Sequence, residues 1–317
     1  MQITAVRKVE PKLSRCISVE SDDRLYVAGD GGELPEFVTH NSVSQRNIIL
    51  GCILRPDNWR FIGIDLKRVE LSSYRSYSNV VLGIATELET ALMALRFASE
   101  TMMSRYTMME EMGQQDFKDL PNAGPKLLVM VDEAGELLSP SGGKTDEAKE
   151  IDALKGEAAI IIGSIARLGR AAGVHLIIAT QRPDATIIAG ETKSNLAARV
   201  NCGRTLGNAS SMILDSAEGT RVKPFPPGRM YVSLNNVGDH GQGFFAKPSW
   251  VDDYLESKGL APDGTPLDGS GEAAGGDGGD LGELDINKST KKQKVDAIAD
   301  WDEDLESLID ENFEDDE

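Results

Sequence analysis

Short apolar runs alternate with helical patterns between residue 42 and about residue 260. This alternation is typical of an α/β fold in which helices cover a largely parallel sheet. Buried strands are predicted at residues 60–65, 126–131 and 174–180. A long amphipathic helix is predicted over residues 87–112, where apolar side chains fall near helical spacing: Leu88, Leu92, Leu95 and Met102.

The composition is that of an ordinary soluble globular protein, with 40% hydrophobic and 27% charged residues in a chain of 317. No run of about 18 apolar residues occurs. The residues after Met1 lack the apolar core of a signal peptide, so we expect a cytoplasmic protein. Cys16, Cys52 and Cys202 are odd in number and far apart, which makes a disulfide framework or a zinc site improbable.

The net charge of −19 is concentrated at the C-terminal end of the chain. From Ala261 onward, 19 Asp and Glu residues stand against 4 Lys, a net charge of −15 that leaves −4 for the preceding 260 residues. The acidity therefore does not exclude a nucleic-acid partner for the globular part.

Two zones follow the predicted α/β domain. Residues 261–294 are interpreted as a flexible linker rich in Gly and Asp, with a basic patch at 288–294. In residues 295–317, apolar side chains fall on one helical face among carboxylates: Ile298, Trp301, Leu305, Leu308 and Ile309. This acidic tail is either a peptide that folds on a protein partner or a disordered, solubilising tail, and the sequence leaves both open.

Two adjacent carboxylates, Asp132 and Glu133, follow the second apolar run. In a nucleotide-binding α/β sheet, ligand chemistry takes place at the carboxyl ends of the strands. Asp132 could hold Mg²⁺ through water, and Glu133 could polarise the water that attacks the γ-phosphate of ATP. The alternative is an ordinary strand that runs into a polar loop.

Residues 166–183, which read ARLGRAAGVHLIIATQRP, closely resemble the helix, strand and following turn of the FtsK/SpoIIIE family. Further segments match the family in order and at similar spacing: 61–67 with Glu70 and Leu71, 95–96 with 103–106, 195–200, and 211–215. The resemblance covers about residues 42–260. It implies a RecA-like P-loop ATPase core with a mostly parallel sheet, using ATP and Mg²⁺.

The resemblance also implies roles for individual residues. Gln181 is the polar sensor placed to contact the γ-phosphate. Arg199 and Arg204 are candidates for an arginine finger that reaches a neighbouring subunit, because these motors work as homo-oligomeric rings, here expected to be hexamers. A surface salt bridge is the alternative for each arginine.

Three other residues in the matching segments carry weaker predictions. His175 lies inside a predicted strand, and we expect a packed residue rather than a catalyst. Asp65 and Lys67 either line the nucleotide site or have a structural role.

The P-loop of such an ATPase is missing, because no Gly-x-x-x-x-Gly-Lys-Ser/Thr occurs in the chain. Ser42 occupies the terminal Ser/Thr position of that loop, where it would be a Mg²⁺ ligand. Residues 37–41 (FVTHN) stand where the glycines and the lysine should be. Without backbone N–H groups and a lysine to hold the phosphates, the chain as written should not hydrolyse ATP.

The replacing residues resemble the downstream end of an intein. Asn41 would cyclise onto its own carbonyl and cleave the chain, His40 would act as general acid, and Ser42 would be the nucleophile that carries the migrating acyl group. Upstream, residues 15–20 and 23–31 resemble the intein's penultimate block. A length of about 41 residues suits a C-terminal intein half made of β-strands.

Cys16 and Thr39 together resemble the Trp–Cys–Thr inteins of phage and actinobacterial genes. In those inteins the internal cysteine attacks the upstream junction, and the tryptophan lies on the N-terminal half. A small buried hydrophobe is the alternative for Cys16. Arg24 departs from the family pattern, which often has a second histidine there, and this leaves the rate of Asn cyclisation open.

The sequence thus predicts a C-terminal intein segment over residues 1–41 followed by the C-terminal part of a motor. A separate chain would supply the N-terminal intein half and the P-loop, and trans-splicing would join the P-loop lysine to Ser42. The product would be an ATPase that moves double-stranded DNA, contacting mostly phosphates.

Other interpretations remain open. The motor could move protein, as secretion-type members of the family do. The unspliced chain could instead be an inactive fragment or a regulatory subunit that binds through its acidic tail. Met1 could also be an internal methionine of one continuous intein-containing gene.

Overall fold

The structure, a computed structural model, describes residues 41–121, 123–181, 183–184, 187–223, 228–243 and 249–267. The predicted intein segment up to residue 40, and the predicted linker and tail from residue 268 onward, lie outside these residues. The chain divides into two units. The parallel-sheet unit comprises Ile49–Leu196 with Pro248–Glu317, and the antiparallel-sheet unit comprises Met1–Ile48 with Ala197–Lys247.

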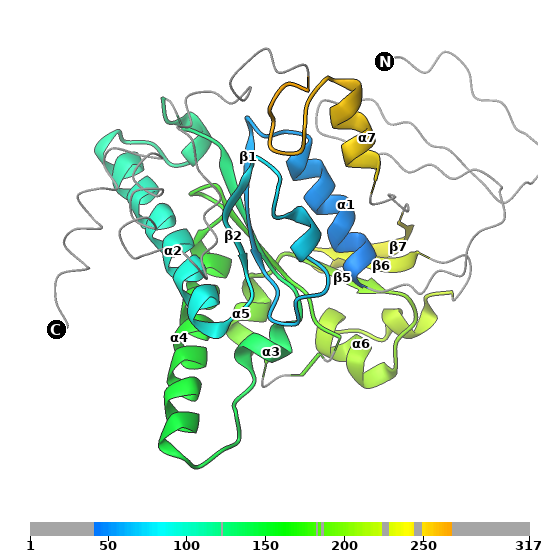
Figure 1. The fold of residues 1–317 in the computed structure, drawn as a ribbon. Helices are drawn as coiled ribbons and strands as arrows, with labels where there is room; N and C mark the ends of the chain where they lie inside the picture. The colour runs from blue at the N-terminus through cyan, green and yellow to red at the C-terminus, as the bar shows by residue number, and fades with distance from the viewer. Residues whose placement is uncertain are drawn as a thin grey trace, which may run out of the picture. The chain divides into compact units, whose positions relative to one another are not determined.

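The first unit is built on a four-stranded parallel sheet of order β2-β1-β3-β4 (Figure 1). The strands are β1 (Trp59–Ile64), β2 (Val80–Ala85), β3 (Lys126–Val131) and β4 (Val174–Ile178). Because helices cover both faces of such a sheet, its central strands are apolar without alternation. β3 shows this, since every residue after Lys126 is buried. The three predicted strands are confirmed, whereas β2, an apolar run that the sequence analysis passed over, was missed.

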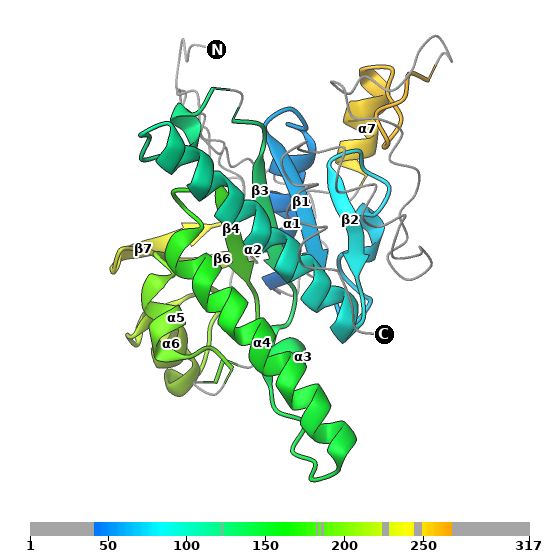
Figure 2. The same ribbon diagram turned by 90° about the vertical axis from the view of Figure 1, so that its left-hand side faces the viewer.

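Two long helices, α2 (Leu88–Glu111) and α4 (Asp146–Leu168), pack together on one face of this sheet (Figure 2). The predicted helix over 87–112 is confirmed to within one residue at each end. It buries the apolar stripe that predicted it, including Leu92, Leu95 and Met102. Residues 49–53 of α1 (Asn41–Ile53) lie on the opposite face of the sheet (Figure 1).

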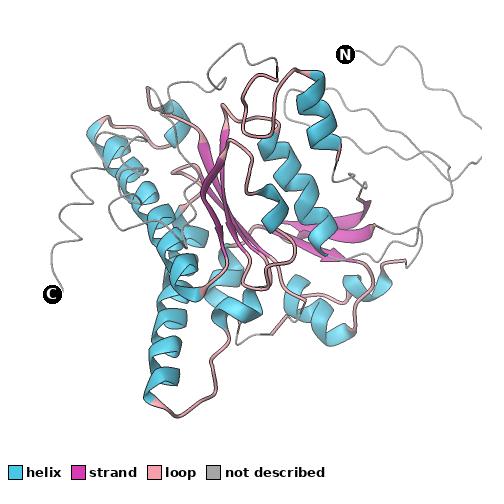
Figure 3. Cartoon of the chain, viewed as in Figure 1, coloured by secondary structure: helices cyan, strands magenta, loops and turns pink. Residues whose placement is uncertain are grey.

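The remaining elements of this unit are short, and Figure 3 shows the division into helices, strands and loops. They are η1 (Ser72–Tyr74), η2 (Phe117–Asp119), α3 (Ala134–Leu138), α5 (Gly190–Asn195) and α7 (Trp250–Ser257). α7 is tied to the loop before β2, because the Tyr77 hydroxyl donates to the Asp252 carboxylate at 2.6 Å. Residues 261–267 form a turn, and the Ser78 N–H donates to the Pro262 carbonyl at 3.2 Å.

A buried arginine joins α2 to the turn between α4 and β4. Arg105 donates to the carbonyls of Ala172, at 3.0 Å, and Pro125, at 2.7 Å, and its guanidinium lies 4.1 Å from the centre of the Phe117 ring. The neighbouring Tyr106 hydroxyl donates to the Leu168 carbonyl at 2.8 Å. These contacts satisfy backbone carbonyls that the turn leaves without partners in regular structure. The Met103–Tyr106 part of the sequence resemblance therefore has a structural role.

The second unit contains an antiparallel sheet of order β5-β6-β7, which the sequence analysis did not predict. Its elements are β5 (Ala198–Cys202), α6 (Gly207–Leu214), η3 (Glu218–Arg221), β6 (Arg229–Leu234) and β7 (Val237–Gln242). Asn235 and Asn236 join β6 to β7 with φ values of 51° and 64°. Two successive residues of positive φ are what a tight hairpin turn requires, and asparagine tolerates them. The Asn-Asn pair was the signal that the sequence analysis overlooked.

Within the described residues, no helix is both long enough and apolar enough to cross a membrane.

Gly173 provides a test of the packing between α4 and β4. Its φ is 68°, and a Cβ there would lie 2.4 Å from the Phe117 ring. We expect Gly173→Ala to lower the free energy of unfolding by about 2 kcal/mol or more. The matched control is Gly156→Ala in α4, where nothing lies within 4 Å of the new methyl group, so stability should rise by about 0.5–1 kcal/mol. Urea unfolding measures both, and equal effects would contradict this account.

Candidate active site

The candidate site lies where β1, β3 and β4 end side by side. Ile64, Val131 and Ile178 are in register across these strands. Backbone hydrogen bonds continue beyond the strands, from the Asp132 N–H to the Ile64 carbonyl at 2.9 Å and from the Ala134 N–H to the Ala179 carbonyl at 2.7 Å. The segments that follow all three strands are therefore held together at the carboxyl ends of the strands. In parallel α/β sheets, ligands bind at these ends.

Glu133 is the central residue of the site. Its φ of 54° places it in the left-handed region, which is unfavourable for a residue with a long side chain. Only 5% of the residue is exposed. Strained conformations of this kind persist only where surrounding structure holds them, and they cluster at functional sites.

Three donors from the segments that follow β1 and β4 hold the Glu133 carboxylate. The Thr180 hydroxyl donates to Oε1 at 2.8 Å. Oε2 accepts from the Gln181 N–H at 3.1 Å and from Lys67 Nζ at 3.3 Å. A carboxylate has about four lone-pair sites, so one site on Oε1 is left to accept a hydrogen bond from water.

These donors keep Glu133 ionised. Burial by itself raises the pKa of the Glu133 carboxyl, but the hydrogen bonds just described and the positive charge of Lys67 outweigh burial and hold the pKa below its usual value. At neutral pH the group is therefore a carboxylate that can orient water and accept a proton.

Asp65 organises the loop that carries Lys67. Asp65 is completely buried, and its Oδ2 accepts from the N–H groups of Val69, Glu70 and Leu71 at 3.0, 2.9 and 2.9 Å. The loop between them is thereby fixed, with Lys67 directed to Glu133. The sequence analysis left open whether Asp65 and Lys67 line the site. The geometry gives Asp65 a positioning role and brings Lys67 to the carboxylate.

Asp132 lies beside Glu133, at the end of β3, and is 8% exposed. Among the described residues, no group of three or more His, Cys, Asp or Glu side chains gathers as a metal site. Mg²⁺ at ATPase sites is usually held by one or two protein groups together with substrate phosphates and water. Asp132 fits that arrangement as a single protein ligand.

The other predicted residues fall in different places. Ser42, in α1, and both candidate finger arginines belong to the antiparallel-sheet unit. Arg199, on β5, forms an ion pair with Asp215, whereas Arg204 is exposed. Asn41 begins α1, and Cys16, Thr39 and His40 lie outside the described residues.

His175, on β4, packs its ring against Trp59, with ring centroids 5.1 Å apart. Burial lowers the pKa of His175, and nearby cationic side chains lower it further. The imidazole is thus a neutral packing group, as the sequence analysis expected, and takes no part in the site around Glu133.

Thr180 was not singled out from the sequence. The structure shows that its hydroxyl contacts the candidate base directly. The sequence could have indicated Thr180, because this residue lies in the ATQRP segment, one residue before the predicted sensor Gln181. The Gln181 backbone reaches Glu133, while its side chain is exposed.

A partial P-loop sequence, Gly-Gly-Lys-Thr, occurs at residues 142–145 just before α4. Thr145 uses its hydroxyl to cap this helix, accepting from the Ala148 N–H at 3.2 Å. Asp146 and Glu147 occupy the first turn and would repel a phosphate. This segment therefore does not replace the missing P-loop.

Together, the fold and the site define an α/β protein with a parallel sheet and a buried acidic pair at the carboxyl ends of its strands. A model of the FtsK/SpoIIIE family matches residues 41–138. Two curated relatives are the DNA translocase FtsK of Helicobacter pylori strain J99, 32% identical over 202 residues, and that of Streptococcus pneumoniae strain R6, 30% identical over 223 residues. Residues 41–138 are thus similar to the FtsK/SpoIIIE family, and the likeness to the two relatives extends over a longer part of the chain.

The matches cover 61% and 64% of this chain but only 22% and 26% of the two relatives. The chain therefore spans about a quarter of their length or less.

Solved structures show the same fold. The conjugation coupling protein TcpA of pCW3, in its monomer form with ATPγS, has a TM-score of 0.61 at 22% identity, over 79% of this chain and 72% of that one. The cytoplasmic domain of the type VII secretion ATPase EccC from Thermomonospora curvata has a TM-score of 0.53 at 21% identity, over 72% and 28%. The likeness bears out the predicted α/β fold with a parallel sheet.

The depressed pKa of Glu133 predicts a pH dependence of stability. A carboxyl with a lower pKa in the folded state stabilises that state above its ordinary pKa of about 4.3, and the stabilisation is lost as the pH falls through the folded-state value. We expect the difference in Tm between the wild type and Glu133→Gln to shrink as the pH is lowered from neutral to acid. Thermal unfolding followed by circular dichroism measures this difference.

The control is Glu136→Gln, which removes an exposed carboxylate three residues away. The difference in Tm between Glu136→Gln and the wild type should vary much less with pH. A Glu133→Gln difference that stays constant or grows in acid would contradict the role given to these hydrogen bonds.

Proposed function

We propose that this chain is the C-terminal part of an ATP-driven translocase of double-stranded DNA, made competent when intein-mediated trans-splicing restores the P-loop before Ser42. The observation that carries the ATPase half of the proposal is the Glu133 carboxylate, held ionised by Lys67, Thr180 and Gln181 at the end of β3. The match of residues 41–138 to the FtsK/SpoIIIE family supports it.

The described residues suit one side of a Mg²⁺–ATP site. Asp132 would be the protein ligand of Mg²⁺, and the remaining lone pair on Glu133 Oε1 would orient the attacking water and take its proton. When bound, the metal would neutralise charge on the transferred phosphoryl group. Lys67 would keep Glu133 deprotonated, and Gln181 lies one residue beyond Thr180, where a side chain could sense the phosphate.

The phosphate-binding side of the site is what the chain lacks, and this motivates the splicing half of the proposal. The His40-Asn41-Ser42 sequence stands directly before the segment that matches the family, whose match begins at residue 41. Splicing with a separate N-terminal half would remove residues 1–41, with Cys16 and Thr39 assisting. Ser42 would first act as nucleophile and then serve in the P-loop as a Mg²⁺ ligand.

The names of the relatives bear on the cargo, and the assembly is part of our proposal. The curated relatives are named DNA translocases, which supports double-stranded DNA as the cargo. We propose a homo-oligomeric ring, with six subunits as the expected number, in which Arg199 or Arg204 reaches the site of a neighbouring subunit. The acidic tail would bind a protein partner outside the motor.

The test is ATP hydrolysis by a chain in which a Gly-x-x-x-x-Gly-Lys segment is joined directly to Ser42. We expect hydrolysis that double-stranded DNA stimulates, and no hydrolysis by the chain as written. Glu133→Gln in the joined protein should lower kcat by about 10²–10⁴-fold, because it removes the group that accepts the proton of water.

Glu136→Gln is the control, since Glu136 lies on the same turn but makes only a long ion pair, 3.9 Å from Lys67. It should leave kcat within about twofold of the unmutated protein. Hydrolysis that Glu133→Gln does not change would refute the catalytic assignment. Hydrolysis stimulated by a protein substrate and not by DNA would favour the secretion-type interpretation.

A further inference from the structure

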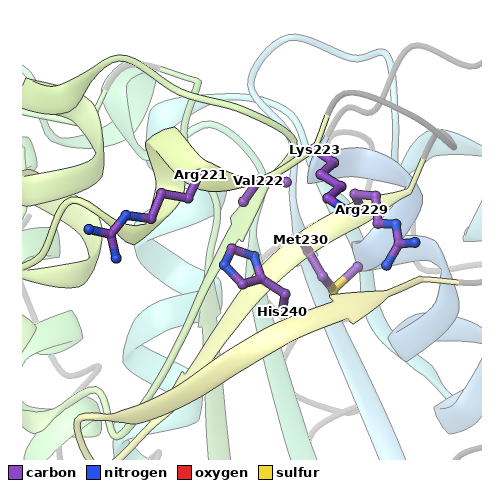
Figure 4. Close-up of a pocket in the computed structure, with 6 residues that line it drawn as sticks. All are labelled: Arg221, Val222, Lys223, Arg229, Met230 and His240. Atoms are coloured by element: carbon purple, nitrogen blue, oxygen red, sulfur yellow. The ribbon is translucent and has the colours of Figure 1, made fainter.

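A pocket in the antiparallel-sheet unit is lined by three cationic side chains, a histidine and two apolar side chains. Its lining residues are Arg221, Val222, Lys223, Arg229, Met230 and His240, and its volume is about 270 Å³ (Figure 4). Val222, which is 1% exposed, and Met230 contribute apolar surface. The cationic groups come from η3, the segment after η3 and β6, and β7 contributes His240. Nothing in the proposed ATPase site uses these residues.

One acidic residue neutralises part of this charge. Glu218 forms an ion pair with Arg221, and its Oε2 lies 3.7 Å from His240 Nε2. In Figure 4, Arg221 points away from Lys223 and Arg229, which lie on the other side of the pocket. Glu218 therefore neutralises positive charge on the Arg221 side of the pocket. Lys223 and Arg229 are the charged groups on the other side.

The Arg229 guanidinium is the unusual group. Its Nε is buried, and no residue in the described part of the chain accepts its hydrogen bond. A buried donor without an acceptor destabilises the folded state. The cost would be recovered if an anion entered the pocket and accepted from this nitrogen.

The scaffold beneath Arg229 is rigid. Arg229 pairs with Gln242 across β6 and β7, and the Gly243 N–H donates to the Gly228 carbonyl at 2.8 Å. Gly228 has a φ of 86°, and a Cβ there would lie 2.6 Å from the Gln242 side-chain nitrogen. The strand pair thus fixes the backbone from which the Arg229 side chain extends, which reduces the entropic cost of binding.

The chemistry of Lys223 and Arg229 favours a phosphate group as the ligand. A guanidinium offers a planar fork of donors that fits two oxygens of one phosphate, and an ammonium adds a point charge. The volume is below the range of about 300–1,000 Å³ of pockets that enclose drug-sized ligands. It suits one phosphate of a longer chain better than a whole nucleotide, and Lys223 and His240 are exposed, as contact with a long ligand requires.

We propose that Lys223 and Arg229 bind a backbone phosphate of double-stranded DNA. This deepens the proposed function and rests on its DNA half, not on its ATPase half. Contact to a phosphate carries no sequence information, so the site would strengthen binding to every duplex equally.

The first experiment measures the affinity of the full chain for a labelled duplex by fluorescence anisotropy, at salt concentrations from about 50 to 200 mM. Loss of one phosphate contact should lower the slope of log affinity against log salt by about 1, whatever the sequence. We expect this change for Lys223→Gln/Arg229→Gln. The control, Arg55→Gln/Lys258→Gln, removes the same charges from the parallel-sheet unit and should change the slope much less. Equal slopes for the two double variants would overturn the proposal.

The second experiment uses the unmutated chain, so it does not depend on how a variant folds. The side-chain Nε–H resonance of Arg229 is followed by NMR during titration with the duplex, with ATP, with inorganic phosphate and with a peptide of residues 295–317. We expect the duplex to shift it at much lower concentration than the other three. A response to ATP alone, to the acidic peptide alone, or to none of the four would overturn the proposal.

Failure of this site and failure of the proposed function give different results. If the Arg229 resonance ignores a duplex that the chain binds, while the P-loop-joined protein shows DNA-stimulated hydrolysis, the site is wrong and the function stands. If the resonance responds to the duplex but the joined protein does not hydrolyse ATP, the site stands and the ATPase assignment fails. A chain that binds no duplex refutes both the site and the DNA cargo.

Discussion

The turn at Glu133 is the point on which the rest of the active site depends. Because the backbone there is left-handed, the carboxylate reaches both neighbouring segments, meeting Lys67 after β1 and Thr180 and Gln181 after β4. One side chain thus links the ends of three strands. Removing any one donor would leave a buried charge with fewer partners. The contacts therefore hold the strained turn in place.

If the site hydrolyses ATP as we propose, two of its tasks fall to different parts of the protein. The parallel-sheet unit supplies a carboxylate that is ionised and has a lone pair left for water. In the proposed function the phosphate cradle would be joined directly before Ser42, where the chain has His40 and Asn41. The function we propose therefore combines hydrolysis at the carboxylate with splicing, which would supply the phosphate cradle.

Much of the parallel-sheet unit could be predicted from the sequence, because strands buried on both faces must be apolar throughout, and β3 is an example. Asp132 and Glu133 could be predicted for the same reason, because they directly follow an apolar strand of this kind. The Lys67–Glu133 contact was not predictable, because it depends on how Asp65 folds the intervening loop. The antiparallel sheet was missed because its strands mix exposed and buried positions, and only Asn235 and Asn236 indicated its hairpin. The pocket at Arg229 was not predictable, because its lining residues are brought together by the pairing of β6 with β7.

The most direct test of the central claim is the intact mass of the native protein isolated from its host, together with any covalent partner. The account predicts a mass that lacks residues 1–41 and is extended at Ser42 by a segment containing a P-loop. The same measurement on a host carrying Asn41→Ala should give no spliced product, since the cleaving side chain is gone. A native mass that begins at Met1, with no extension at Ser42, would contradict the account and leave the chain without a phosphate-binding loop.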